Sequence, residues 1–367
     1  MINSLTQQID RAPDYLAAAW PAAYQAACAL PKYRLEGLDE ILLLGSGDSY
    51  HAALAIEMAI AHWTSNRVRA APAMFAGRYL LPRMRARGVQ GLVVGISASG
   101  EVARTIEALE LANDGGFQTL AVTSNSRSTL AMTANRIIKI SVPEMEVVPG
   151  ILSYLASLLM GFALCAVLAS EPADEEITAG ITLLPQILDD WGTAQLEKVS
   201  RFGEKIIGRE PIVFLGAGPA YGSALFAAAK VVEATGVQAW GQELEEWAHL
   251  EYFCEPAAMP TWFLSSGGRA NSRENELLTA AKEIGRKVII NRWAIKADLP
   301  RSTMEVLSPF GLWLGPSLFA ATLSDQLEES PFRGFGGGRS AREGGGPSRI
   351  RSSARVKNFQ ELMEQHK

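Results

Sequence analysis

The sequence is poor in the residues that build metal centres and disulfide frameworks. It has three cysteines, Cys28, Cys165 and Cys254, and four histidines in 367 residues. The cysteines lie far apart, and the glutamates crowded between positions 243 and 251 lack the set of histidine or cysteine partners that a transition metal needs. We therefore expect no metal and no other cofactor, and unpaired thiols that suit a reducing cytoplasm.

An excess of basic charge is also missing. The chain has 34 lysines and arginines against 39 acidic residues, a net charge of −5. Because the phosphates of a nucleic acid need a basic face, this balance argues against a nucleic-acid partner. The first residues, Met-Ile-Asn-Ser-Leu-Thr-Gln-Gln, have neither a basic n-region nor an apolar h-region. We therefore expect no export signal and a cytoplasmic protein.

Long apolar runs are scarce, with one exception at residues 151–170. This run is close to the length of a membrane span, but it contains Ser153, Tyr154, Ser157 and Gly161 and lacks flanking lysine or arginine anchors. It predicts a helix buried on all sides and no contact with a membrane. Because a lone two-domain chain would struggle to cover such a helix, we also expect a homodimer.

The sequence does contain an internal repeat. Residues 44–54, LGSGDSYHAAL, align with residues 215–225, LGAGPAYGSAL. Each copy follows a short apolar run and opens a helical pattern, and each leads to a further apolar run that ends in a serine-bearing turn. Strands that alternate with helices predict an α/β protein, with parallel sheets covered by helices on both faces and the domain duplicated.

The chain divides into five segments. We expect a helical lead-in at 1–34, a first α/β domain at 35–172, a helical connector at 173–200, a second α/β domain at 201–330 and a tail at 331–367. The tail is rich in Gly, Ser and Arg as far as Arg355, a composition that cannot form a packed core of its own. It could be disordered, bind RNA weakly as an Arg/Gly segment, or lie over an active site.

The segment from Gly91 to Thr105 is typical of a phosphate site. An apolar run rich in Val and Ile gives way to Ser97-Ala-Ser99-Gly100, and a helical pattern follows. Such a turn aims backbone N–H groups and two hydroxyls at one point, where the helix dipole also favours an anion. The alternative is a serine that merely caps an ordinary α/β turn. A dinucleotide site is disfavoured, because tyrosines replace the third glycine in both Gly-x-Gly turns.

Three residues of the second domain are candidates for acid–base chemistry. Lys230 and Glu233 lie three positions apart in an apolar helical pattern, which favours one face and a raised pKa for the carboxylate; the alternative is a surface salt bridge. His249 follows sixteen positions after Glu233, between Trp247 and Tyr252. Such a histidine is either a packed core residue or a catalyst. His51, beside the first glycine turn, is a weaker candidate.

Together, the paired halves, the Gly-Ser-Gly-Asp-Ser49 turn, the Ser97-x-Ser99-Gly100 turn and the Lys230/Glu233/His249 spacing resemble a known family. They are similar to the tandem sugar-isomerase (SIS) domain proteins, especially the isomerase half of glucosamine-6-phosphate synthase and the fructosamine-6-phosphate deglycases. The resemblance covers about residues 35–330. It implies two tandem SIS domains, each a flavodoxin-like three-layer sandwich.

The resemblance also implies roles for individual residues. The glutamate that moves a proton between C1 and C2 corresponds to Glu233, the histidine that assists ring opening to His249, and the lysine near the sugar to Lys230. The residues that correspond to the grip on the sugar phosphate are Ser46, Gly47, Ser49, Ser97, Ala98 and Ser99, with the two non-serine positions contributing backbone.

The sequence departs from the family pattern in four places. Val102 stands where the family often has threonine, so one phosphate hydroxyl is missing unless Thr105 compensates. The second serine turn, Ser265-Ser-Gly-Gly, is degenerate, and we expect one phosphate site per chain. No C-terminal lysine motif is recognisable, although Arg333, Arg339 or Lys357 could substitute, and no nucleophilic cysteine follows Met1 for a glutaminase.

These patterns predict an enzyme whose partner is a small sugar phosphate. The expected reaction is ketose–aldose isomerisation coupled to C–N cleavage of an amino- or amine-substituted hexose 6-phosphate, as in a deaminase or deglycase. A simple phosphosugar isomerase and a non-catalytic phosphosugar sensor are the alternatives. The sequence does not name the sugar, the amine or the direction of the reaction.

Overall fold

The computed structural model describes residues 4–31, 37–145, 149–203, 206, 208–293, 295, 298–329 and 354–364. Its contacts divide the chain into two compact units. We call residues 16–143, 152–179 and 348–367 the first α/β unit, and residues 1–15, 144–151 and 180–347 the second α/β unit. Helices α2 (Ala12–Cys28) and α9 (Glu171–Gly203) contribute residues to both, and the connector expected at 173–200 lies within α9.

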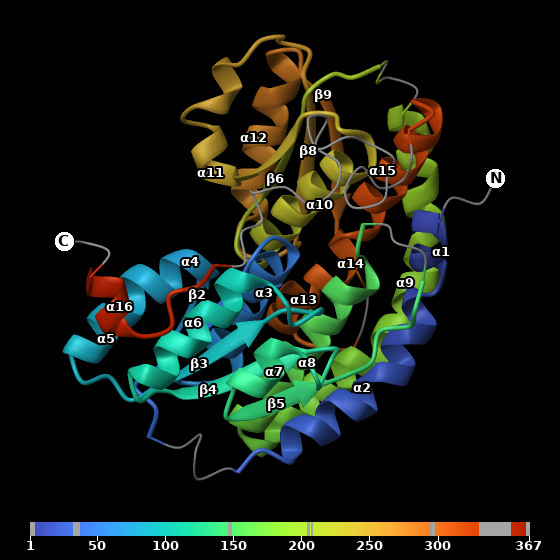
Figure 1. The fold of residues 1–367 in the computed structure, drawn as a ribbon. Helices are drawn as coiled ribbons and strands as arrows, with labels where there is room; N and C mark the ends of the chain where they lie inside the picture. Colours follow the sequence, from blue (N-terminus) through green and yellow to red (C-terminus); the bar gives the residue numbers. More distant parts are fainter. Residues whose placement is uncertain are drawn as a thin grey trace. The chain divides into compact units, whose positions relative to one another are not determined.

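The first α/β unit contains a five-stranded parallel sheet (Figure 1). Its strands, in spatial order, are β2 (Val68–Pro72), β1 (Glu40–Gly45), β3 (Gly91–Ile96), β4 (Gln118–Thr123) and β5 (Arg136–Lys139). This is the flavodoxin-like order 2-1-3-4-5. Strands β1 and β3 are almost uniformly apolar and are buried on both faces, as is typical of the central strands of a parallel sheet.

Helices cover both faces of this sheet. The helices that follow its strands are α3 (Asp48–Trp63), α4 (Ala73–Phe75), a π-helical turn (Ala76–Leu80), α5 (Leu81–Ala86), α6 (Ala103–Asp114) and α7 (Thr129–Thr133). Helices α5, α6 and α7 pack on one face around Leu42, Val93 and Ala121, whereas α3 and α8 (Leu152–Leu168) pack together on the other. These layers confirm the predicted fold class.

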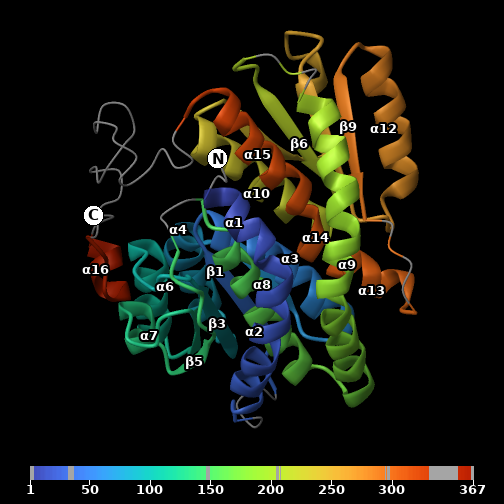
Figure 2. The same cartoon turned by 90° about the vertical axis from the view of Figure 1, so that its right-hand side faces the viewer.

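The second α/β unit has a four-stranded parallel sheet in the order β7 (Ala239–Glu243), β6 (Ile212–Gly216), β8 (Pro260–Ser265) and β9 (Lys287–Arg292). Helix α12 (Asn271–Glu283) lies on one face, and α9 and α15 (Leu314–Gln326) lie on the other, as Figure 2 shows. The remaining elements are α1 (Ser4–Asp10), α10 (Pro219–Thr235), α11 (Leu244–Trp247), a 3-10 turn (Glu251–Phe253), α13 (Arg301–Leu307) and α14 (Pro309–Leu312).

The apolar run at 151–170 forms the buried helix α8, as the sequence predicts. From Leu152 to Ala166 every residue except Ser153 is buried. Because α8 packs against α3 and β4 of its own unit, it needs no partner subunit to cover it, and the argument from this helix to a homodimer is wrong. No single helix in the described ranges is long and apolar enough to cross a bilayer; one bent pair, Arg301–Leu307 with Pro309–Gln326, meets that test by length and composition.

A glycine sets the close approach of α8 to α3. An ideal Cβ on Gly161 would lie 2.3 Å from Cδ1 of Ile56, so a side chain there would force either the Ile56 side chain or the helices to shift. We expect Gly161→Ala to lower the free energy of unfolding by about 1–3 kcal/mol, the usual cost of overpacking. The matched control is Gly192→Ala in α9, where the nearest atom is 3.8 Å away. That change should be neutral or stabilise by up to about 1 kcal/mol. Urea unfolding of both variants checks this, and equal effects would contradict it.

Candidate functional site

The first glycine turn joins β1 to α3 through Ser46 and Gly47. An ideal Cβ on Gly45 would lie 2.7 Å from the carbonyl carbon of Ser49, so this position needs glycine. Gly47 has a φ of +56°, in the region that glycine adopts most easily. Ser46 and Ser49 are partly exposed at the N-terminus of the 16-residue helix α3, where backbone N–H groups attract anions. His51 lies one turn into α3, with its Nδ1 3.6 Å from Oδ1 of Asp48.

The serine turn joins β3 to α6. Gly100 has a φ of +70°, and an ideal Cβ there would lie 2.0 Å from Oγ of Ser128. Its N–H donates to the Ser97 hydroxyl at 3.1 Å, and the N–H of Glu101 donates to the Ser99 hydroxyl at 3.3 Å. Ser97 is buried and Ser99 is exposed. Ser97 therefore braces the turn from inside, and Ser99 offers its hydroxyl on the outer side.

The sheet register brings these two turns together. Leu44 of β1 pairs with Gly95 of β3, so Ser46 and Ser97 follow neighbouring strands at the same distance from the paired residues. Strand β1 lies between β2 and β3. The chain passes from β1 to β2 on one side and then returns to β3 on the other side, so the strand order reverses at β1. Parallel sheets bind ligands in the crevice at such a switch point. The first unit thus gathers Ser46, Gly47, Ser49 and the 97–99 turn at the edge where a ligand is expected.

Thr105 lies beneath this turn and is completely buried. Its hydroxyl has no hydrogen-bond partner among the described residues, although its N–H donates to the Val102 carbonyl at 3.0 Å. Val102 itself is 37% exposed, as expected for a residue at the start of α6. That the Thr105 hydroxyl replaces the one missing at Val102 stays a prediction. It would require the phosphate to enter the buried interior of the turn.

Sequence reasoning missed a fifth serine at this edge, which lies on a third segment of the chain. Ser124 follows β4, its N–H donates to the Ala98 carbonyl at 3.0 Å, and its buried hydroxyl lacks a partner within the described part of the chain. The Thr123 hydroxyl donates to the same carbonyl at 3.2 Å. The signal was present, because Val122 pairs with Ile96 and β4 must therefore end beside the serine turn. These contacts fix the orientation of the Ala98 peptide.

In the second unit, Lys230 and Glu233 meet on α10. The Lys230 Nζ lies 2.6 Å from Oε2 of Glu233 and 4.8 Å from the centre of the Phe226 ring. The lysine side chain is fully buried, whereas the glutamate side chain is 38% exposed. The apolar surroundings thus enclose the ammonium, whereas the carboxylate, which the sequence pattern placed in the same apolar environment, is accessible. This geometry differs from an ordinary surface salt bridge, in which both partners are solvated.

His249 does not pack into the core. Its side chain is 71% exposed and its Nε2 lies 3.6 Å from Oε1 of Glu245, while Trp247 is buried. The interpretation of His249 as a core residue is therefore wrong: the chain leaves α11 after Trp247, and the imidazole emerges on the surface. Leu250 and Phe253, 66% and 70% exposed, follow it. An exposed imidazole is free to meet a ligand, a partner chain or solvent.

The C-terminal segment 354–364 docks on α6 of the first unit. Glu107, buried in α6, accepts a hydrogen bond from Val356 N–H at 2.8 Å and pairs with Arg78 and Arg104 at 2.8 and 2.5 Å. In helix α16 (Phe359–Glu364), the Phe359 ring centre lies 4.9 Å from the Arg85 guanidinium. Lys357 is exposed, and Arg333 and Arg339 lie outside the described residues. This part of the tail is an ordered component of the unit.

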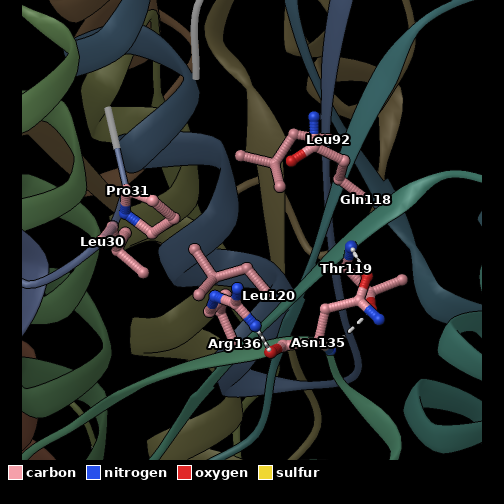
Figure 3. Close-up of a pocket in the computed structure, with 8 residues that line it drawn as sticks. All are labelled: Leu30, Pro31, Leu92, Gln118, Thr119, Leu120, Asn135 and Arg136. Carbon is pink, nitrogen blue, oxygen red and sulfur yellow. Dashed lines mark hydrogen bonds between the residues drawn. The ribbon is translucent and has the colours of Figure 1, made fainter. Parts of the chain in front are cut away.

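A cavity of about 250 Å³ opens at the amino ends of the strands of the first sheet (Figure 3). It is lined by Leu30, Pro31, Leu92, Gln118, Thr119, Leu120, Asn135 and Arg136. These include the first residues of β4 and β5 and the second residue of β3. Since the strands are parallel, their amino ends lie opposite the serine turns. The cavity is therefore separate from the candidate phosphate site.

Comparison with known proteins gives concordant results. Residues 35–167 match the model of the SIS domain family. Over 230 residues the chain is 27% identical to glutamine–fructose-6-phosphate aminotransferase (isomerizing) of Mycolicibacterium smegmatis, covering 60% of this chain and 35% of that protein. The chain thus spans about a third of the length of the curated relatives that it matches.

Solved structures share the fold across both units. The C-terminal domain of glucosamine-fructose-6-phosphate aminotransferase from Francisella tularensis has a TM-score of 0.72 at 16% identity, covering 89% of this chain and 97% of that one. Tagatose-6-phosphate ketose/aldose isomerase from Escherichia coli has a TM-score of 0.70 at 18% identity, covering 90% and 94%. At these identities the likeness establishes the fold.

The contacts of Glu107 with Arg78, Arg104 and Val356 predict that the stability of the protein depends on pH. Burial raises the pKa of Glu107, but hydrogen bonds from Arg78 and Val356 and the charges of both arginines outweigh it, so its pKa is lowered overall. A lowered pKa adds stability above the ordinary carboxyl range, and this stability is lost as the pH falls through the folded pKa. Glu107→Gln should therefore destabilise the protein at pH 7 by about 3–5 kcal/mol, as for a broken buried ion pair. The deficit should vanish in acid.

Urea unfolding between pH 7 and pH 3 measures this deficit. The control is Glu197→Gln, which removes an exposed pair with Arg201 and should cost under about 1 kcal/mol at any pH. A deficit for Glu107→Gln that stays constant over this pH range would rule out the assigned electrostatic role.

Proposed function

Since residues 35–167 match the SIS domain family, we propose that the chain is an enzyme acting on an amino- or amine-substituted hexose 6-phosphate. The observation that supports this most is the pair of serine-bearing turns at the carboxyl ends of β1 and β3, inside the matched SIS domain. Neighbouring turns with exposed hydroxyls and N–H groups suit a phosphate dianion, and the names of the relatives concern sugar phosphates.

We assign the phosphate to these two turns. Ser49 and Ser99 donate hydroxyl hydrogen bonds, and Gly47 and Ala98 offer backbone N–H groups. Ser46 and Ser97 complete the set, with Ser97 acting partly through the internal hydrogen bond that shapes the turn. Anchoring the phosphate fixes the sugar carbons, so that proton transfer becomes an effectively intramolecular step.

Glu233 is our candidate for the group that moves a proton between C1 and C2. Its carboxylate is partly exposed and held by a buried ammonium, which suits a base that must meet a ligand. Because Lys230 is enclosed and bonded to Glu233, we propose that it positions this carboxylate and contributes positive charge near the enol-type intermediate. His249 would protonate the ring oxygen during ring opening, a role open to an exposed imidazole.

Coupling to C–N cleavage is the finer part of the proposal. The aminotransferase relatives, by their name, transfer an amino group to a sugar phosphate, and the reverse chemistry releases an amine. A plain isomerase would use the same proton transfer without amine release. Incubation with glucosamine 6-phosphate or a fructosamine 6-phosphate separates these activities, because only an enzyme that cleaves the C–N bond liberates ammonia or amine. A phosphosugar sensor would do neither.

A homodimer remains part of the proposal on different grounds. Leu250 and Phe253 form an exposed apolar pair directly after His249, and a self-association surface would cover them. Such a surface would also bring His249 to another copy of the chain.

Glu233→Gln tests the base. The substitution keeps the shape and removes the proton acceptor, so turnover should fall by about 10²–10⁴-fold while affinity for the sugar phosphate stays within about tenfold. The readout is exchange of the C1 or C2 hydrogen of fructose 6-phosphate in D₂O, followed by NMR. Glu283→Gln, an exposed carboxylate on α12, should exchange at the wild-type rate. Retention of most activity by Glu233→Gln would remove Glu233 from its role.

Ser97→Ala combined with Ser99→Ala tests the phosphate turn. Hydrogen bonds to charged groups contribute about 1.5–3 kcal/mol each, so the double variant should bind fructose 6-phosphate at least about tenfold more weakly. Unphosphorylated fructose should bind both proteins equally poorly. Ser272→Ala, an exposed serine on α12, is the control and should leave calorimetric affinity unchanged. Wild-type affinity in the double variant would place the phosphate elsewhere.

A further inference from the structure

The second unit repeats the geometry of the candidate phosphate edge. Gly216 of β6 pairs with Leu264 of β8, so a glycine turn and a serine turn again follow neighbouring parallel strands. Gly218 has φ 54° and ψ −129°, against 56° and −131° at Gly47. Duplication has therefore preserved the backbone of the turn in detail, and an equivalent anion site is expected beside it.

The first turn of this second edge has lost its hydroxyls. At the offset that aligns Gly45 with Gly216, the positions of Ser46 and Ser49 are taken by Ala217 and Ala220. The backbone remains suited to an anion, but the side chains that would donate to one are absent at these two positions.

The serine turn of the second edge already holds a carboxylate. Glu305 of α13, 6% exposed, accepts a hydrogen bond from the backbone N–H of Arg269 at 3.0 Å through Oε1, and one from the Arg269 side chain at 3.1 Å through Oε2. An ideal Cβ on Gly268 would lie 2.0 Å from the carboxyl carbon of Glu305. The carboxylate thus lies directly against bare backbone, in a space that exists because position 268 has no side chain.

Two further details of this turn match an anion site. Gly267 has a φ of +71°; the first serine turn has its positive-φ glycine, Gly100 at +70°, one position later relative to the strand. The Ser266 hydroxyl is buried, with the residue only 3% exposed, and no described residue forms a hydrogen bond with it. The neighbouring Ser265 hydroxyl donates to Glu274. A second acidic side chain from this unit therefore also binds at the turn.

We propose that the 265–269 turn is an anion-binding site that the chain itself occupies, with the Glu305 carboxylate in the place of a ligand phosphate. Because Glu305 is tethered to the same unit, its effective concentration at the turn exceeds that of a free anion. The second unit consequently takes up no sugar phosphate, and each chain binds one. This consequence rests on the proposed function of the first serine turn, whereas the occupancy of the second turn does not.

The test removes the internal anion and supplies an external one. Glu305→Ala is made together with Ser97→Ala and Ser99→Ala, so that the first-unit site is weakened, and the probe is inorganic phosphate. The matched control is Glu305→Gln in the same background, which fills the space without charge. We expect phosphate to raise the Tm of the Glu305→Ala protein by about 3 °C or more relative to chloride at equal ionic strength. The Gln control and the parent should both show a smaller shift, equal to each other, from the weakened first-unit site.

A second measurement locates the site. Hydrogen exchange should show phosphate-dependent protection of residues 265–270 in the Glu305→Ala protein, and adding Arg269→Gln should abolish it. If Glu305→Ala fails to fold without phosphate, recovery of its native circular dichroism by phosphate but not chloride is the same positive result. If it stays unfolded in both, Glu305→Ser takes its place in the test. A folded Ala or Ser variant that shows no more phosphate-dependent shift or protection than the parent overturns the proposal.

The outcome is independent of the proposed function. Phosphate binding of wild-type affinity in the Ser97→Ala, Ser99→Ala parent would refute the first-unit site. Absence of gained binding in the Glu305→Ala protein would refute the self-occupied site alone.

Discussion

The parallel pairing of β1 with β3 is the constraint on which the candidate site depends. Leu44 opposite Gly95 places the two serine-bearing turns side by side, and the strand order makes this edge a switch point. A shift of one residue in that register would carry the turns apart, and it would exchange the side chains of the two buried faces and so disturb their packing against the helices. Burial of β1 and β3 on both faces therefore holds the phosphate turns in place, and packing of the sheet prepares the chemistry at its edge.

Duplication followed by divergence explains the contrast between the two units. Both keep a glycine turn with nearly the same φ and ψ, which shows how strongly strand-to-helix geometry is retained. The first unit keeps serines in its glycine turn, whereas the second unit has alanines at the two equivalent positions. The serine turn of the second unit also holds a carboxylate from α13. The second unit instead supplies the buried Lys230 that holds Glu233, so one copy has specialised in features that suit anion binding and the other in an ion pair that suits proton transfer.

Local patterns in the sequence predicted the elements of the fold, but contacts between distant segments could not be predicted from them. Apolar strand runs and the repeated Gly-x-Gly turns were sufficient for two parallel sheets, and the run at 151–170 for a buried helix. The coverage of that helix by α3 could not be seen, which misled the argument for a dimer. The exposure of His249 depends on where α11 ends, and the contacts of Glu107 with Val356 and of Glu305 with Arg269 join residues far apart in the chain. Ser124 could have been found from strand order alone.

Hydrogen exchange of the whole protein with and without fructose 6-phosphate tests the central claim most directly, since it reports where a ligand binds without assuming a reaction. The account predicts slower amide exchange at residues 45–51 and 96–102, with no change at 216–220 or 265–269. Protection confined to the second unit, or to the cavity at the amino ends of β3, β4 and β5, would contradict it.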